Sequence, residues 1–549
     1  RPSKQKNMQK TYKKIWTSIL VISTTVLTAQ IPMAWAERYN APPDMQDEAR
    51  SIQVDTSGNV FVTGSGFNSS GNLDMITVKY DEDGNQMWVR NYDRGVNDND
   101  EGKMLVLDDS GNVYVTGYSR GSTTSLDIIV IKYDNAGNQQ WTSFYNGTSN
   151  GIDEGKSIAV DGSGNVFVCG YSSDSLFFYD AITLMFNSNG VQQWVQTYDG
   201  AASGNDELLE LVIDASSNVY VVGNTEATTS NYDFLTIKYN SAGTQQWLQT
   251  YNGPSGSGDY GKGITLDNNN NVVVTGQSFQ TNQWFDYLTI KYSNSGTQQW
   301  TARYNNASNR YEDAWDVITD NSGYVYITGQ SQAVGNNSTP PDCATVKYTP
   351  AGNQVWVKRF DGGFGNLDDR AFAIALDDTA NVYISGYSSN ASNYDCITIK
   401  YDSAGTEEWN LRFNSVYNQN DQSLAMTVKN GDVYITGKST NAVNEDFLTI
   451  RYSYSAVGIL ETTSSFGSLL AYPVPSNNTV IIDFPQLQGT AESIITLTDV
   501  NGRIVMTTPV GQGVKSILLD LTQLTSGCYT ISQLNQEGEL IARQLMIKD

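Results

Sequence analysis

The segment NVFVTG at residues 59–64 decides the fold, because it returns seven times along the chain. The copies read NVYVTG, NVFVCG, NVYVVG, NVVVTG, YVYITG, NVYISG and DVYITG, and they end at Gly117, Gly170, Gly223, Gly276, Gly329, Gly386 and Gly437. Counted from Gly64, consecutive copies are 53 residues apart five times, then 57 and then 51. A nearly fixed period of this length indicates a chain built from copies of one supersecondary unit.

Each unit is expected to form four short β-strands. In the second unit the strand-like stretches are residues 103–107, 112–117, 128–133 and 140–145. They are rich in Val, Ile, Thr and Tyr and lack helical periodicity. The turns DDSGN and DNAGN supply the Gly and Asn that tolerate positive φ. Four-stranded sheets repeated around an axis make a β-propeller, so we predict an all-β fold with eight blades.

The two ends of the repeat region complement each other. The last unit stops after its third stretch, FLTIRY at residues 447–452, and lacks the W-x-x-x-Y strand that ends other units. The segment WAERYN at residues 35–40 matches WTARYN at residues 300–305. We therefore predict that the N-terminal strand completes the eighth blade of a propeller spanning residues 30–453 and closes the ring, which leaves no sheet edge unpaired.

Residues 1–29 are expected to be a leader and signal peptide. Met8 reads as the start, and three lysines precede the apolar run at residues 15–29. A basic segment followed by a short apolar one is typical of a secretory signal, and the run is shorter than the roughly 20 apolar residues that span a bilayer. Closure of the ring needs the strand that follows, which favours cleavage after Ala29, although the A-x-A context also allows cleavage after Ala36. After signal removal we expect no transmembrane segment.

Composition excludes several classes of function. The chain has 33 basic and 58 acidic side chains, a net charge of −25 and no histidine. Such an acidic protein repels phosphate backbones, so a nucleic-acid partner is not expected. The absence of histidine rules out Ser-His-Asp catalysis and His-ligated zinc. The cysteines show no metal-ligand spacing and are expected to be small apolar core residues rather than a disulfide framework. They are Cys169, Cys343, Cys396 and Cys528.

The units resemble the bacterial β-propeller repeats known as SBBP repeats. They share the pattern D-E-A-x-x-I-x-V-D-x-S-G-N-V-Y-V-T-G followed by D-Y-L-T-I-K-Y-D-x-x-G-x-Q-Q-W. The resemblance covers residues 37 to about 452, and the eight units depart from the seven blades after which the family is named. It implies the propeller fold, but a propeller can carry many unrelated activities.

Seven units share a G-x-x-x-W motif at the third turn. Its tryptophans are Trp88, Trp141, Trp194, Trp247, Trp300, Trp356 and Trp409. The motif resembles the tryptophan-docking motif of eight-bladed quinoprotein dehydrogenases, which would imply a quinone cofactor. We favour a structural role, in which one large aromatic side chain per blade fills the seam to its neighbour, because a quinone site also needs a metal cluster that we do not find. No cofactor is predicted from this motif.

One acidic residue opens the innermost strand of every unit. This series comprises Asp47, Asp100, Asp153, Asp206, Asp259, Glu312, Asp369 and Asp421. A second series opens the third strand and comprises Asp74, Asp127, Asp180, Asp233, Asp286, Asp342, Asp395 and Asp446. Both are expected at one mouth of the central channel, where they could bind calcium, a cation that prefers carboxylate oxygens. The alternative, which we favour, is that each carboxylate caps backbone N–H groups or pairs with the cation, a lysine or Arg451, that recurs on the third strand.

Units five to seven depart from the repeat and supply the candidate ligand-binding residues. These are Trp284, Tyr311, Asp313, Trp315, Asp316 and Arg370, accompanied by an insertion at residues 336–341. Aromatic side chains beside carboxylates suit a surface that binds sugars, and paired carboxylates can hydrolyse a glycosidic bond. The leading hypothesis is a binding scaffold for a glycan or a surface protein, with no catalytic residue assigned. The alternatives are an extracellular carbohydrate-active enzyme with its site in these units and a purely structural surface protein.

The sequence of the tail predicts a linker at residues 454–468 and a small Ig-like β-sandwich at residues 469–549. Short strand-like segments alternate there with turns such as DVNG and NQEG. The tail resembles the C-terminal sorting domain of the type IX secretion system in YPVP at residues 472–475, D-x-x-G-R at residues 499–503 and L-x-x-G-x-Y at residues 524–529. The resemblance implies recognition by outer-membrane secretion machinery, followed by release or by attachment at the cell surface.

Overall fold

The computed structural model divides into two compact units, Gln30–Ala456 and a second that contains Val457–Asp549. The residues described are 33–42, 44–95, 98–174, 176, 178–228, 231–280, 284–306, 310–332, 340–363, 367–453, 470–472, 479–483, 493–499, 504–511, 514, 516–524, 527–535 and 540–548. Every helix or strand element among them is a β-strand, which confirms the predicted all-β class. None of them belongs to a helix long and apolar enough to cross a membrane. The predicted leader at residues 1–29 and linker at residues 454–468 lie outside the described residues.

In the described part of Gln30–Ala456 the strands form eight four-stranded sheets, which we number in chain order. Sheet 1 contains β2 (Asp47–Val54), β3 (Val60–Phe67), β4 (Leu73–Tyr80) and β5 (Gln86–Tyr92). Sheet 2 contains β6 (Asp100–Leu107), β7 (Val113–Arg120), β8 (Leu126–Tyr133) and β9 (Gln139–Tyr145). Sheet 3 contains β10 (Asp153–Val160), β11 (Val166–Ser173), β12 (Tyr179–Phe186) and β13 (Gln192–Tyr198). Sheet 4 contains β14 (Asp206–Ile213), β15 (Val219–Thr228), β16 (Asn231–Tyr239) and β17 (Gln245–Tyr251).

The remaining four sheets follow the same plan. Sheet 5 contains β18 (Asp259–Leu266), β19 (Val272–Phe279), β20 (Phe285–Tyr292) and β21 (Gln298–Tyr304). Sheet 6 contains β22 (Glu312–Thr319), β23 (Val325–Gln332), β24 (Pro341–Tyr348) and β25 (Gln354–Phe360). Sheet 7 contains β26 (Asp369–Leu376), β27 (Val382–Ser389), β28 (Tyr394–Tyr401) and β29 (Glu407–Phe413). Sheet 8 contains β30 (Asp421–Lys429), β31 (Asp432–Thr440), β32 (Glu445–Tyr452) and β1 (Met33–Tyr39).

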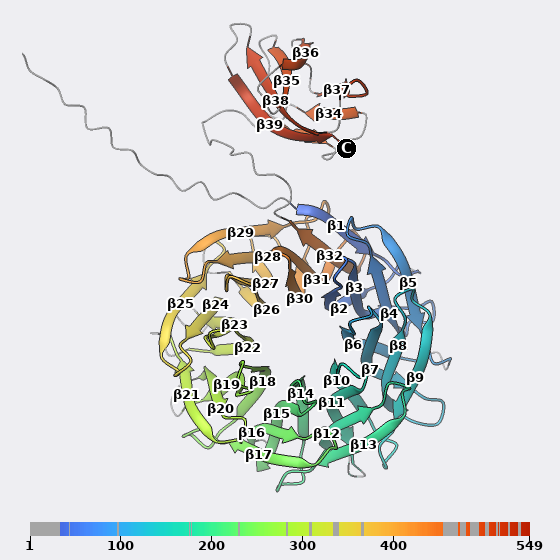
Figure 1. The fold of residues 1–549 in the computed structure, drawn as a ribbon, viewed down its shortest axis with the longest axis vertical. Helices are drawn as coiled ribbons and strands as arrows, with labels where there is room; N and C mark the ends of the chain where they lie inside the picture. Colours follow the sequence, from blue (N-terminus) through green and yellow to red (C-terminus); the bar gives the residue numbers. More distant parts are fainter. Residues whose placement is uncertain are drawn as a thin grey trace, which may run out of the picture. The chain divides into compact units, whose positions relative to one another are not determined.

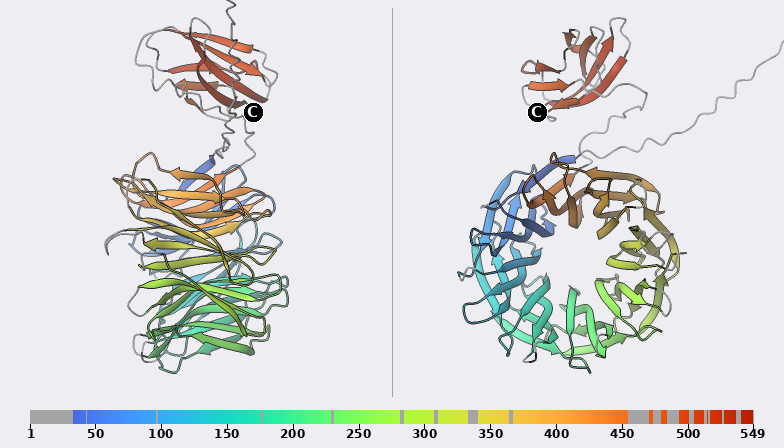
Figure 2. Two further views of the ribbon diagram at one scale, coloured as in Figure 1. Left: turned by 90° about the vertical axis from the view of Figure 1, so that its left-hand side faces the viewer. Right: turned by 180° about the vertical axis from the view of Figure 1, so that it is seen from behind.

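Sheets 1 to 7 share one antiparallel topology, in which the four strands pair in chain order. Figure 1 shows the sheets arranged around a common axis, with the first strand of each nearest the axis and the outermost strand on the rim. In the side view of Figure 2 the strands cross the thickness of this arrangement. Each first strand has a β-bulge at its fourth residue. Because neighbouring strands are antiparallel, the loops before the first and third strands lie at the same end of each sheet.

Sheet 8 joins the two ends of the repeat region. Its order is β1-β32-β31-β30, so the N-terminal strand takes the outer position that the fourth strand holds elsewhere. The pairing sets Trp35 opposite Arg451 and Tyr39 opposite Phe447. The Arg38 side chain also forms an ion pair with Asp446 at 2.8 Å. The predicted pairing of the N-terminal segment with the last unit is therefore confirmed.

The repeated tryptophans fill the seams between neighbouring sheets. In sheet 1, Trp88 is buried and donates from Nε1 to the backbone oxygen of Asn135, in the third turn of sheet 2, at 3.1 Å. The turn residue Gly137 has a φ of +81°, and a Cβ there would lie 2.8 Å from the indole. The same hydrogen bond recurs from Trp141, Trp194, Trp247, Trp300 and Trp356, and from Trp35 onto sheet 1. The seam role predicted for the G-x-x-x-W motif is confirmed.

Three cysteines behave as the sequence predicts. Cys169, Cys343 and Cys396 are buried and free. Burial raises the pKa of each thiol well above its usual value, so these side chains act as small apolar core residues. The side chain of Cys528 lies outside the described residues.

The described residues of Val457–Asp549 form two sheets. The first contains β33 (Leu470–Tyr472), β34 (Thr479–Asp483) and β37 (Ser516–Asp520). The second contains β36 (Ile504–Val510), β35 (Ser493–Asp499), β38 (Gly527–Asn535) and β39 (Leu540–Lys548). Buried apolar residues of both sheets, Ile482 and Leu519 in the first and Leu497 and Ile531 in the second among them, form one core cluster. Each of these strands coincides with one of the short strand-like segments predicted from the sequence, except β33, which has only three residues.

Candidate functional site

A cavity of about 260 Å³ lies between sheets 5, 6 and 7. Its lining residues are Trp284, Tyr311, Gln330, Gln332, Pro341 and Arg370. Three of the six predicted ligand-binding residues are among them. The volume is just below the range of roughly 300–1,000 Å³ that is usual for small-molecule sites.

The cavity lies at the end of the sheets where the loops before the first and third strands meet. Tyr311 directly precedes β22, and Arg370 is the second residue of β26. Trp284 directly precedes β20, and Pro341 opens β24. Gln330 and Gln332 lie at the end of β23 that faces the same loops. Every sheet has these positions, so the cavity depends on the residue types that sheets 5 to 7 place there.

Gln330 carries a buried polar atom without a partner at the cavity wall. The residue is 4% exposed, and its Oε1 forms no hydrogen bond with any of the described residues. Neighbouring strands set its position, since Gln330 is opposite Asp313 of β22 and Cys343 of β24. A buried acceptor left without a donor costs about 1–3 kcal/mol. A ligand hydroxyl or N–H group in the cavity would satisfy it.

Tyr311 holds a hydroxyl group at the wall of the cavity. This hydroxyl lies 2.9 Å from Gln277 Oε1 and 3.3 Å from Asp313 Oδ2, so it can donate to either. Burial, reinforced by the negative charge of Asp313, raises the pKa of Tyr311 far above its usual value, and the phenol stays protonated. The ring packs edge-on against Phe285, with centroids 5.8 Å apart. Tyr311 is thus a fixed polar group on an aromatic support.

Arg370 brings a positive charge to the cavity. Its Nε and Nη2 donate to the two oxygens of Asp368 at 2.9 and 3.0 Å. Burial acts to lower the pKa of Arg370, but the hydrogen bonds and charge of Asp368 raise it. Tyr387 also donates to Asp368, at 3.0 Å, and so fixes this carboxylate. A guanidinium has five N–H donors, and the bonds to Asp368 use two of them.

Asp313 and Trp315 lie beside the cavity rather than in its lining. Asp313 is buried, and both its oxygens lie 2.7 Å from Lys262 Nζ. Burial raises the pKa of Asp313, and the charge of Lys262 opposes this shift. The same ammonium lies 3.8 Å from the ring centroid of Trp315, which packs edge-on against Phe372. These residues support Tyr311, whose hydroxyl contacts Asp313.

Asp316 belongs to the seam between sheets 6 and 7. Its Oδ2 accepts the backbone N–H of Ile374 at 3.0 Å, and its Oδ1 accepts that of Val317 at 2.7 Å. Burial raises the pKa of Asp316 to about 6. The equivalent residue of sheet 4, Glu210, accepts the backbone N–H of Ile264 in sheet 5 at 2.8 Å. The two predicted carboxylates of β22 therefore have separate partners, a lysine for one and the backbone of a neighbouring strand for the other.

Sequence reasoning missed Gln330, whereas Pro341 belongs to the insertion that it singled out at residues 336–341. Gln330 follows the repeated Gly329, at a position that other units fill with residues as different as Ser65 and Lys438. Residue identity at that position therefore carries no signal. Pro341 ends the insertion at residues 336–341, of which residues 340–341 are described. The added length of this unit is the one sequence signal that pointed to the region.

The acidic residues that open the first strands are buried, with 0 or 1% exposure. In at least seven of the described sheets one carboxylate oxygen accepts a backbone N–H from the loop before the strand, as Asp153 does from Gly147 at 2.8 Å. The other pairs are Asp47 with Ala41, Asp100 with Arg94, Asp206 with Gly200, Asp259 with Gly253, Asp369 with Gly362 and Asp421 with Ser415. The capping interpretation of these residues is confirmed, and calcium binding by the ring stays a prediction.

Burial also favours the neutral form of these caps. It raises the pKa of Asp47 to about 7, of Asp100 and Asp153 to about 6 and of Glu312 to about 8. The hydrogen bonds that each carboxylate accepts oppose the shift. A cation would have to displace the protons that burial favours.

Five of the eight acidic residues that open the third strands pair with arginines, which corrects the predicted pairing with the cations of the third strand. Ion pairs join Arg38 to Asp446, Arg94 to Asp127, Arg303 to Asp286, Arg359 to Asp342 and Arg412 to Asp395. The third-strand lysines of sheets 1, 4 and 6 contact the next sheet, as Lys347 does by donating to the backbone oxygen of Ser403 at 2.8 Å. Lys291 and Lys400 instead form ion pairs within their own sheets, with Asp267 and Glu408. Asp342 and Lys347 are five residues apart on β24, and therefore about 17 Å apart along an extended strand.

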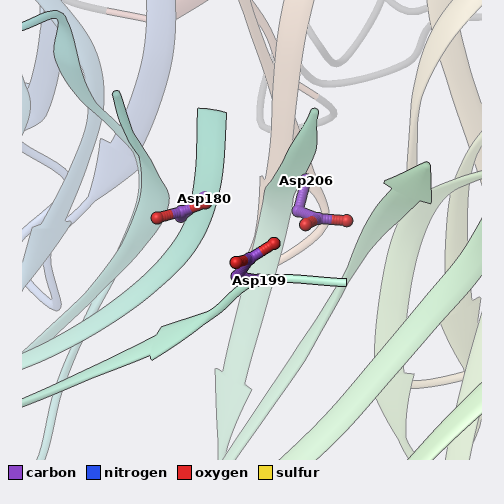
Figure 3. Close-up of side chains that lie close together, drawn as sticks. All are labelled: Asp180, Asp199 and Asp206. Atoms are coloured by element: carbon purple, nitrogen blue, oxygen red, sulfur yellow. The ribbon is translucent and has the colours of Figure 1, made fainter. Parts of the chain in front are cut away.

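Sheet 3 is one of the sheets whose third-strand acid, here Asp180, has no arginine partner among the described residues. Thr197 of β13 stands where β25 carries Arg359. Asp180 gathers instead with Asp199 and Asp206, and their carboxylate oxygens lie within 4.8 Å of one another (Figure 3). Burial, together with the charge of Asp199, raises the pKa of Asp180 to about 6. Three carboxylates at this spacing suit a hard cation, although Asp199 belongs to neither of the two series from which a cation site was predicted.

Comparison with known families agrees with the organisation into repeats and a tail. Residues 470–548 match a family model described as a secretion system C-terminal sorting domain. Residues 141–178, which run from β9 to the loop before β12, match a model described as a β-propeller repeat. Both matches confirm the resemblances found in the sequence.

Individual relatives are more distant. An uncharacterized WD repeat-containing protein of Acanthamoeba polyphaga mimivirus is 25% identical over 362 residues, or 54% of this chain, which spans 25% of that protein's length. The solved structure of Sqt1 from Chaetomium thermophilum is similar with a TM-score of 0.48 and 9% identity, over 75% of this chain and 97% of that one. The β-propeller domain of the Trilobed protease from Pyrococcus furiosus has a TM-score of 0.37 and 6% identity, over 74% and 95% of the two chains. The chain thus combines a β-propeller repeat with a secretion system C-terminal sorting domain, and this tail indicates a secreted protein that is attached to the cell surface.

Proposed function

We propose that sheets 1 to 8 are the blades of one closed, eight-bladed β-propeller and that the tail is an Ig-like sandwich. Support for closure comes from β1, which pairs with β32. The same strand carries Trp35, which donates to the backbone oxygen of Glu82 in sheet 1 at 2.9 Å. This hydrogen bond is the one that the seam tryptophans make elsewhere. Because β1 serves both neighbours, its removal would expose a strand edge and open a seam.

We infer that this propeller is a binding scaffold for a polar ligand, a glycan, held in the cavity of sheets 5 to 7. The observation that carries this function is Gln330, which lines the cavity and whose buried Oε1 has no partner among the described residues. Beside it, Trp284 is 48% exposed and offers a flat aromatic surface on which a sugar ring can pack. Tyr311 and Arg370 add polar groups to the same lining. A small number of fixed polar groups beside an aromatic surface is typical of a ligand pocket.

The positions of the carboxylates favour binding over hydrolysis. A glycosidase generally needs two carboxyl groups that flank one glycosidic bond. Asp313 is engaged by Lys262, and Asp316 accepts backbone N–H groups. Neither residue lines the cavity. Polysaccharide turnover that is abolished by Asp313→Asn or Asp316→Asn would support the alternative, a carbohydrate-active enzyme.

A saccharide-binding assay with two cavity variants tests this function. A panel of oligosaccharides is screened on an array, and the best ligand is then measured by calorimetry. Trp284→Ala and Gln330→Leu should each weaken its binding at least about tenfold, because a packing surface and a buried hydrogen bond are lost. Val416→Ala, which truncates a side chain that is 96% exposed in the loop before β30, is the control and should bind like the wild type.

Two results would contradict the proposal. One is wild-type affinity in both cavity variants, with thermal unfolding also unchanged. The other is the absence of binding to every saccharide of the panel by a folded wild-type protein.

A further inference from the structure

Arg370 stands where most other sheets carry an acid. The second residue of the first strand is, from sheet 1 to sheet 8, Glu48, Glu101, Glu154, Glu207, Tyr260, Asp313, Arg370 and Gln422. Arg370 is the one cation in a series that contains five acids. The first strands are nearest the common axis (Figure 1), so this reversal of charge lies on the inner wall of the sheets.

In sheets 1 to 3 the acids of this series are neutralised by cations two positions further along the strand. Arg50 Nη2 lies 3.1 Å from Glu48 Oε1, and Arg50 Nε lies 2.6 Å from Glu101 Oε1. Lys103 Nζ lies 2.8 Å from Glu101 Oε1 and 3.3 Å from Glu154 Oε1. Each of these cations is a bulge residue and reaches acids of its own and of the next sheet. We call this row the ion-pair ladder, and its residues are Glu48, Arg50, Glu101, Lys103, Glu154 and Lys156.

Arg370 is not part of such a ladder. The bulge residues of sheets 6 and 7 are Trp315 and Phe372, which carry no charge. The nearest acid of the series, Asp313, is held by Lys262 through both of its oxygens. The acid that Arg370 does bind, Asp368, comes from the loop before β26 and occupies one side of the guanidinium. The Arg370 side chain is 34% exposed and lines the cavity, so its remaining donors are accessible to a ligand.

Resting on the proposed function, we propose that the cavity takes a sugar that carries a carboxylate, namely a uronic acid residue of a glycan. The planar fork of Arg370 matches a carboxylate and can bind it through two parallel hydrogen bonds. Gln330 Oε1 accepts a hydroxyl of the same sugar, and the exposed surface of Trp284 packs on its ring. Each distinctive group of the lining then has a partner on one ligand.

The acidity of the whole chain does not oppose this assignment at physiological salt. Charges more than about 8 Å away are largely screened at 0.15 M ionic strength. Arg370 is the one charged residue among those that line the cavity. Of the two acids beside it, Asp313 is paired with Lys262, and Asp368 is paired with Arg370 itself, so a bound carboxylate would share the guanidinium with Asp368. A bound carboxylate would therefore meet no unpaired acid in the described lining.

Uronic acid oligomers and their methyl esters test the assignment, because esterification keeps the sugar and the linkage but removes the charge. Oligomers of galacturonic, glucuronic, mannuronic and guluronic acid are titrated into the full chain by calorimetry. The wild type should bind one acid form at least about tenfold more tightly than its ester. Arg370→Gln should reduce that affinity to the level of the ester. Arg120→Gln, which changes an arginine that is 47% exposed in sheet 2, is the control and should leave it unchanged.

The outcomes separate this assignment from the proposed function. Equal affinity for acid and ester, or tighter binding of neutral hexose oligomers, would overturn the uronic acid assignment while the glycan function stands. Tighter binding of sulfated oligomers than of any carboxylate would also overturn the assignment. The comparison of acid with ester needs only the wild type, so it decides the matter even where Arg370→Gln unfolds. The absence of binding to every saccharide would contradict the proposed function itself.

Discussion

The inner wall of sheets 1 to 3 and that of sheets 6 and 7 use the same strand positions for different purposes. In the first region the ion-pair ladder joins each sheet to the next. In the second, Trp315 and Phe372 replace the bulge cations of sheets 1 to 3, Arg370 replaces an acid, and a cavity lies at the loop end of the sheets. A residue that every unit repeats serves the packing of units against each other. The proposed binding site lies where the repeat is broken.

Breaking the ladder should reduce stability more than removing Arg370. Glu101 is 5% exposed and pairs with Arg50 and Lys103. Glu101→Gln leaves both cations without this anion and should lower the free energy of unfolding by about 3 kcal/mol. Arg370→Gln removes an ion pair whose side chains are about one third exposed and should lower it by less than about 1 kcal/mol. Urea unfolding at pH 7 measures both variants, and similar losses would contradict the distinction between the two regions.

The buried caps and the ladder should respond to pH in opposite directions. Burial raises the pKa of Asp47 to about 7, so the folded protein retains a proton that the unfolded chain releases near pH 4. The contribution of this cap is fully present below about pH 4 and is lost as the pH rises through about 7. For Glu101, burial acts to raise the pKa, but the charges of Lys103 and Arg50 hold it below its usual value. Its contribution is present above about pH 4.3 and is lost as the pH falls.

A series of urea unfolding curves from about pH 3 to pH 8 checks these signs. Asp47→Asn should flatten the fall in unfolding free energy between about pH 4 and pH 7 by the equivalent of about one proton. Glu101→Gln should flatten the fall below about pH 4 and leave the alkaline side unchanged. If Asp47→Asn leaves the whole profile unaltered, Asp47 titrates alike in the folded and unfolded chain, and the account of the caps is wrong.

Most of the fold could be predicted from the sequence because its determinants are local and repeated. The stretch predicted as a strand at residues 112–117 is β7 (Val113–Arg120), since alternating apolar residues and Gly-Asn turns act over a few positions. The pairing of β1 with β32 was also predictable. The last unit lacks its fourth strand, and one other segment of the chain has the matching pattern.

The site could be predicted only where a residue type departs from the repeat. Trp284, Tyr311 and Arg370 stand out in this way and line the cavity. Asp316 also stands out, but the β-bulge one residue earlier shifts the register of β22, and Asp316 caps the neighbouring strand instead. Gln330 does not stand out, because its role depends on a buried oxygen that three packed strands leave without a partner. A pattern of residue types along the sequence does not predict that arrangement.

The central claim is that the ligand site lies where the residues of sheets 5 to 7 differ from the repeated pattern. Backbone hydrogen exchange, measured with and without the best-binding saccharide, tests this claim. The account predicts added protection of the backbone at residues 284–287, 310–314, 340–343 and 368–371, and none in the equivalent ladder segments at residues 47–51, 100–104 and 153–157. Protection of the ladder segments, or protection spread evenly over all sheets, would contradict it.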